Sequence, residues 1–143
     1  MRDIDLDTYL GMEIHRDRAK GVLTLCQTTY TRKMLESYGF TSGPVVKTPM
    51  DSKTVFTVND GQADEDTIKD YQAKIGSLLF LAIHTRADIL YAVVTLSRFM
   101  TNPSPIHIAA VKRIFRYLRI YPDMRIPYLR DGGDQLKSYT NAN

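Results

Sequence analysis

Apolar and polar positions alternate along the first part of the chain. Leu10, Met12 and Ile14 are separated by small or polar residues, and Leu23 and Leu25 repeat the pattern after Gly21. Strict alternation places the apolar side chains on one face of a strand, and a glycine between two such runs permits a tight turn. Residues 8–26 are therefore predicted to form a β-hairpin.

The apolar period changes after residue 27. Tyr30, Met34 and Tyr38 are four residues apart and Gly39 follows them, so a helix is predicted over 28–38 with the glycine ending it. Residues 41–66 are rich in Thr, Ser, Asp, Pro and Gly, a composition typical of loops. We expect this stretch to be a linker between two parts of the domain.

Three more helices are predicted in the second half of the chain, over 68–84, over 87–100 and after Ser104. In the middle one, four apolar residues at i, i+4, i+7 and i+11 form a single stripe (Ile89, Val93, Leu96 and Met100). The last helix has the clearest start signal. Ser104 is suited to be its N-cap, and Pro105 fills the first helical position, where a missing N–H has no cost.

This last helix has two contrasting faces. Its apolar face is formed by Val111, Ile114, Phe115 and Leu118, and its basic face by Lys112, Arg113, Arg116 and Arg119. Beyond it, residues 126–130 and 136–140 are predicted to be short strands around a turn at 131–133. The pattern as a whole predicts an α+β fold with an N-terminal β-hairpin, a four-helix bundle and a short C-terminal β-strand pair.

Composition supports one globular domain, since the 143 residues are 43% hydrophobic and 24% charged. The net charge of +3 is small, but its distribution is uneven. Residues 106–130 carry six basic residues against one acid, whereas residues 51–70 carry six acids against two lysines. Such segregation is typical of a helix that faces an anion.

Several classes of protein are excluded or disfavoured. The lone Cys26 excludes an internal disulfide and is expected to be a buried structural thiol. No run of 18 apolar residues exists, and three aspartates interrupt the N-terminus, so there is no recognisable signal peptide. His15, His84 and His107 are not at ligand spacing, so we predict no metal site and no cofactor.

Short motifs in a fixed order give the chain a resemblance to a known family. Residues 9–17 read Y-L-G-M-E-I-H-R-D, residues 25–30 read L-C-Q-T-T-Y, and residues 48–50 read T-P-M. Together with 71–119, they resemble copia-type retrotransposon reverse transcriptases in the thumb and connection region. The resemblance implies a helical thumb-like part over 27–122, with the 41–66 loop inside it. It also implies that 9–17 holds a primer end and that 126–143 is a truncated entry into ribonuclease H, all within a single fragment over 1–143.

The departures from that family predict a protein without enzyme activity. The polymerase motif Y-V-D-D does not occur in these 143 residues. Asn141 stands where the family has the first ribonuclease H aspartate, and a neutral amide is a poor ligand for the hard cations of such sites. Arg86 and Asp88 match the family pattern as well, and a structural ion pair at a helix start is the expected role for them.

Two functional hypotheses remain open. The tetrapeptide formed by Arg116, Tyr117, Leu118 and Arg119 fits R-x-L-R, and short copia-like frames resemble secreted RxLR effectors of plant-pathogenic oomycetes. That resemblance implies a secreted protein that suppresses defence and cell death in the host cytoplasm or nucleus through an unknown host plant protein. The alternative is an inactive copia fragment with weak, nonspecific nucleic-acid binding through Lys112, Arg113, Arg116 and Arg119. Neither hypothesis requires membrane insertion.

Overall fold

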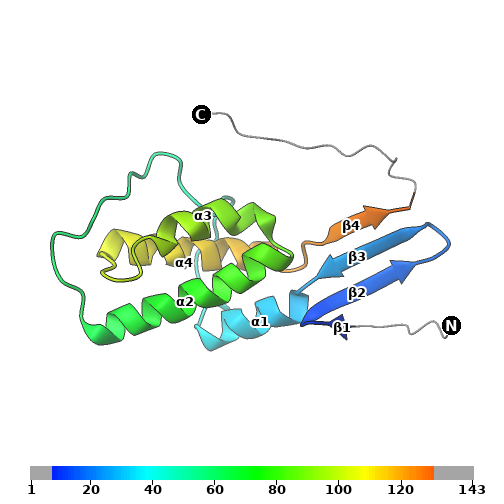
Figure 1. Cartoon of the computed structure of the whole chain (residues 1–143), viewed down its shortest axis with the longest axis horizontal. Coiled ribbons are helices and arrows are strands. Elements are labelled where there is room, and N and C mark those ends of the chain that lie inside the picture. Colours follow the sequence, from blue (N-terminus) through cyan, green and yellow to red (C-terminus); the bar gives the residue numbers. More distant parts are fainter. Residues whose placement is uncertain (1–7, 131–143) are drawn as a thin grey trace.

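The computed structural model describes residues 8–130, which form a small antiparallel sheet joined to a bundle of four helices (Figure 1). The strands are β1 (Thr8–Tyr9), β2 (Met12–Asp17), β3 (Val22–Cys26) and β4 (Ile126–Leu129). The helices are α1 (Thr28–Ser37), α2 (Glu65–His84), α3 (Ala87–Ser97) and α4 (Pro105–Ile120). Sheet and helices lie end to end, so the described part of the molecule is elongated.

The sheet has the order β1-β2-β3-β4, and each neighbouring pair is antiparallel. The β2–β3 hairpin turns at Gly21, whose φ is 62°. Residues with a side chain disfavour this left-handed conformation, whereas glycine adopts it readily. β4 returns from the end of the helical bundle and pairs with β3, where Pro127 lies opposite Thr24. The two outer strands are therefore the two-residue β1 and the proline-containing β4.

Local signals explain where the longest helices begin. Asp64 caps α2, because its carboxylate accepts a hydrogen bond of 2.8 Å from the backbone N–H of Thr67. Ser104 precedes Pro105 at the start of α4, and its N–H donates to Nδ1 of His107 at 3.0 Å. Both contacts occupy polar groups that a helix terminus would otherwise leave unpaired.

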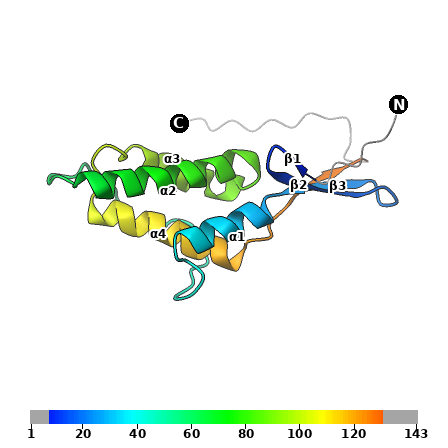
Figure 2. The ribbon, with the colours of Figure 1, turned by 90° about the horizontal axis from the view of Figure 1, so that it is seen from below.

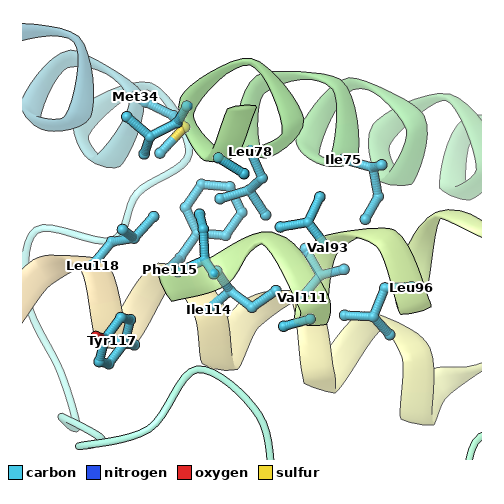
Figure 3. Close-up of a cluster of buried hydrophobic side chains, with 14 of the residues drawn as sticks. Met34, Ile75, Leu78, Val93, Leu96, Val111, Ile114, Phe115, Tyr117 and Leu118 are labelled. Carbon is cyan, nitrogen blue, oxygen red and sulfur yellow. The ribbon is translucent and has the colours of Figure 1, made fainter. Parts of the chain in front are cut away.

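The core lies where apolar faces of all four helices meet (Figure 3). Figure 2 shows α2 and α3 in one layer and α1 and α4 in the other. The buried residues of the core come mainly from α2, α3 and α4, with Met34 and Leu35 from α1. Burial of apolar surface contributes about 25 cal/mol per Å², so this bundle is the main source of stability.

The segment between α1 and α2 contains no helix or strand, but it packs against the bundle. We call residues 41–63 the 41–63 loop. Val46, Met50 and Phe56 of this loop are partly buried against the core. Asn102, after α3, accepts from Ala63 N–H at 2.9 Å and donates to the Gly61 carbonyl at 2.9 Å. The loop is thus attached along its length and is more than a linker.

The structure confirms the predicted α+β class, the hairpin, the four helices and a C-terminal strand. α2 begins at residue 65 and not 68, because Asp64 provides a cap three residues earlier. α3 ends at residue 97 and not 100. The pairing of β4 with β3 was not predicted, and the second strand expected at 136–140 lies outside the described residues.

None of the helices in the described part is long and apolar enough to cross a membrane.

Candidate nucleic-acid interface

The basic face predicted for α4 is partly covered by the 41–63 loop. Arg113 donates to the Thr48 carbonyl at 3.2 Å and to the Thr48 hydroxyl at 2.9 Å. Arg119 donates to the carbonyl of Gly43. Arg116 lines a hollow of about 220 Å³ between α4 and the loop, and Lys112 is exposed. Two of the four predicted cations therefore already have acceptors within the chain, which weakens this face as a phosphate-binding surface.

The R-x-L-R tetrapeptide lies in the same helix, and its middle points into the bundle. Leu118 is 0% exposed and Tyr117 is buried beside it, while Arg119 is held by the 41–63 loop. A receptor that reads an extended peptide could reach Leu118 only after the C-terminal part of α4 had unfolded. In the native fold Tyr117, Leu118 and Arg119 are therefore already engaged within the chain.

Arg86 and Asp88 form the structural ion pair that the sequence predicts. Two guanidinium nitrogens of Arg86 donate to the two carboxylate oxygens of Asp88 at 2.9 and 2.8 Å, and a third donates to the Tyr121 carbonyl at 2.6 Å. The Tyr117 hydroxyl also donates to Asp88, at 2.8 Å. Burial alone would raise the pKa of Asp88, but the bonds and charge of Arg86 and the Tyr117 hydroxyl hold that pKa below its ordinary value. The cluster fixes the start of α3 to the end of α4.

A second basic surface lies at the far end of the sheet, around the β2–β3 turn. An open hollow of about 480 Å³ is lined there by Arg16, Arg18 and Arg130, with Tyr128 and Leu129 beside them. Backbone N–H of Arg130 donates to the Gly21 carbonyl at 2.8 Å. A side chain at residue 21 would approach the Arg130 side chain to 3.1 Å, so glycine leaves room for Arg130 to cross the turn. We call Arg16, Arg18, Lys20 and Arg130 the turn cluster. Asp17 lies among them and pairs with Lys20 at 3.5 Å, so basic residues outnumber acids here by four to one.

Sequence reasoning identified only part of this surface. The resemblance pointed to residues 9–17 as the segment that holds a primer end, which includes Arg16. Arg130 could not be assigned to the same place, because nothing in the sequence indicates that β4 returns to pair with β3. Cationic side chains with an exposed tyrosine are the usual means of contacting phosphates and bases.

Comparison with known proteins relates nearly the whole chain to transposon polyproteins. It is 36% identical to the retrovirus-related Pol polyprotein from transposon TNT 1-94 of Nicotiana tabacum, over 94% of the chain. The identity to the putative transposon Ty5-1 protein YCL074W of Saccharomyces cerevisiae is 32%, over 100% of the chain. The chain is a homologue of copia-type Pol polyproteins. The predicted resemblance to that family is thereby confirmed.

The chain spans 46% of the yeast relative and 10% of the tobacco polyprotein. The chain is also 34% identical to the secreted RxLR effector protein 161 of Plasmopara viticola, over 51% of the chain and 51% of that protein. No established protein-family profile matches the chain, and no solved structure matches it. Both resemblances found in the sequence, to transposon Pol polyproteins and to an RxLR effector, therefore correspond to proteins that are similar to this chain.

Proposed function

We propose that the chain is a non-catalytic, nucleic-acid-contacting segment of retrotransposon origin that holds a duplex by its phosphates. Support comes from the homology to Pol polyproteins over almost the whole chain and from the turn cluster around the open hollow of the sheet. Contacts to phosphates carry no sequence information, so the affinity is expected to be nonspecific.

The absence of catalysis is part of this proposal. Nucleotidyl transfer and RNA hydrolysis by metal ions need clustered carboxylates. Within residues 8–130, the group with metal-ligand spacing is Glu13, His15 and Cys26, which contains one carboxylate, and Asn141 replaces the nuclease aspartate of the family. Primer extension or cleavage of an RNA–DNA hybrid by the purified chain, lost on adding a chelator, would contradict this part of the proposal.

A salt titration tests the binding surface. If four phosphates are contacted, affinity for a short DNA duplex should fall about a hundredfold between 50 and 200 mM salt, because the bound counterions are released on binding. Arg16→Glu should weaken binding more than Arg113→Glu, since Arg113 is already bonded to Thr48. Lys69→Glu, an exposed position on α2, is the matched charge-reversal control and should leave affinity unchanged. Equal losses in all three variants would show that binding follows net charge and not the turn cluster.

The second candidate function is that of a secreted RxLR-type effector, favoured by the similarity to the Plasmopara viticola protein. In this role the chain would leave the pathogen and act in the cytoplasm or nucleus of a host plant cell through a host protein. Because Leu118 is buried, the tetrapeptide would not serve as an exposed delivery signal in the folded chain. The activity would instead reside in the folded surface.

Expression in leaf tissue challenged with a cell-death elicitor tests the effector function. The chain should slow lesion formation relative to an unrelated protein of the same size. Arg116→Ala should leave that suppression intact, because the proposed activity does not use the tetrapeptide. Lesions forming at the control rate would reject the effector role and leave the nucleic-acid proposal untouched.

A further inference from the structure

Three potential metal ligands from different parts of the hairpin meet near the junction of sheet and helices. Glu13 and Cys26 are directly opposite each other in the β2–β3 ladder, and His15 is two residues along β2 from Glu13. Residues with these relations share one face of a sheet. Their ligand atoms, a carboxylate oxygen, an imidazole nitrogen and a thiol sulfur, all lie within 4.8 Å of one another.

Hydrogen bonds hold two of these side chains in place. One carboxylate oxygen of Glu13 accepts from the backbone N–H of Thr29, at the start of α1, at 2.7 Å. The other oxygen accepts from the Cys26 thiol, with 3.5 Å between oxygen and sulfur. Glu13 is thus fixed against α1 and faces the sulfur with its second oxygen. His15 is exposed and can reorient without disturbing the core.

We propose that Glu13, His15 and Cys26 form a binding site for a borderline-soft divalent cation, with zinc as the best match. Sulfur, imidazole nitrogen and carboxylate oxygen are the three donor types that zinc takes, whereas magnesium and calcium require oxygen ligands. This inference is independent of nucleic-acid binding, because the turn cluster uses other side chains.

The geometry needs only a small contraction. Tetrahedral zinc, with bonds of 2.0 to 2.3 Å, places its ligand atoms about 3.5 Å apart. The Cys26 sulfur and the second Glu13 oxygen are already 3.5 Å apart, so rotation of the exposed His15 side chain is the main adjustment. On binding, the Sγ–H bond of Cys26 breaks, its proton goes to solvent, and the sulfur takes the cation in place of that proton. A water completes the fourth position on the exposed side of His15.

Such a site would join β2, β3 and α1 through side chains, where the backbone is otherwise the main connection. The cation would link β2 to β3, and the bond between Glu13 and Thr29 would extend the link to α1.

Cobalt(II) is the direct probe, since it replaces zinc and reports its ligands by absorption. Titration of the purified chain should give one cobalt per chain, with a near-ultraviolet band from thiolate-to-cobalt charge transfer. Cys26 is the only cysteine, so this band reports on one residue and should disappear in Cys26→Ser. Zinc added afterwards should bleach the band by displacement.

His15→Gln provides a variant that does not threaten folding, since the side chain is exposed. It should weaken zinc binding about tenfold or more, because one of three protein ligands is lost. Glu36→Gln, an exposed carboxylate on α1, is the matched control and should bind zinc as the parent chain does. Three results would each overturn the site: a cobalt spectrum without the thiolate band, equal zinc affinity in His15→Gln and the control, or one metal per two chains.

Discussion

Arg86 shows how much of this fold depends on single residues. It is 2% exposed, and its guanidinium bonds to Asp88 and to the Tyr121 carbonyl while it lies 5.7 Å from the centre of the Tyr117 ring. A buried cation is tolerated only where its donors are satisfied. Arg86 therefore joins α3 to the end of α4 by polar contacts, at a place where the apolar core ends.

Replacing Arg86 tests this role. Arg86→Ala leaves Asp88 partly buried without its cation, so the free energy of unfolding should fall by about 3 kcal/mol or more. Arg32→Ala breaks an ion pair with Asp123 in which both side chains are more than half exposed, and the loss there should stay below about 1 kcal/mol. Urea denaturation followed by circular dichroism measures both. Equal losses would mean that Arg86 does not stabilise the fold through its buried bonds.

At the scale of elements, the start of α4 is built around a buried histidine. His107 stacks on Phe99 with 3.8 Å between ring centres, and its Nδ1 accepts from the Ser104 N–H at 3.0 Å. Burial lowers the pKa of His107 below 6.5, against a smaller opposing effect of the Thr57 backbone. The neutral ring is therefore the form that the fold selects.

Because the fold favours the neutral form of His107, the stability of the protein should decrease as the pH falls. A histidine whose pKa is lower in the folded state stabilises the protein above its unfolded pKa, and this stabilisation is lost as the pH falls through the folded value. The free energy of unfolding should accordingly decrease between about pH 7 and pH 5. His107→Gln, which can still accept from Ser104, should be less stable by about 1 kcal/mol at pH 7 because it loses the ring stack. Its denaturation curves should change less over this pH range than those of the parent chain.

The 41–63 loop is the other element with a specific anchor. Four hydrogen bonds connect Asn102 to Asn59, Gly61 and Ala63. Asn102→Ala removes all four, so the loop should detach from the end of α3 at a cost of about 2 kcal/mol in unfolding free energy. Limited proteolysis should then cut within residues 41–63 much faster than in the parent chain. Asn59→Ala removes only part of this set and should show an intermediate rate.

The elements differ in how far the sequence could predict them. The α4 start was predictable because Ser104 and Pro105 act locally, and the stripe over Ile89, Val93 and Leu96 fixed α3 by its period alone. The covering of Arg113 and Arg119 by the 41–63 loop was not predictable, because a loop without periodicity gives no signal of where it packs. The proximity of His15 to Cys26 was not predicted either, because it depends on the register in which β2 pairs with β3.

At the scale of the whole molecule, stability should be unevenly distributed. The bundle holds nearly all buried apolar residues, whereas Cys26 is the one buried residue within the described strands. Amide exchange of β2 and β3 should therefore be faster than that of α3 and α4, because local opening of the sheet exposes little apolar surface. Hydrogen exchange by mass spectrometry would measure this difference. Equal protection over 8–26 and 87–118 would contradict it.

The short outer strands of the sheet have a consequence for behaviour at high concentration. Unpaired strand edges recruit further chains and begin aggregation. Here β1 offers two residues, and Pro127 in β4 has no N–H to donate to an incoming strand. Pro127→Val would restore that donor, and the variant should form thioflavin-positive aggregates sooner than the parent chain, as followed by light scattering. The missing N–H of Pro127 thus limits growth of the sheet between molecules at the β4 edge.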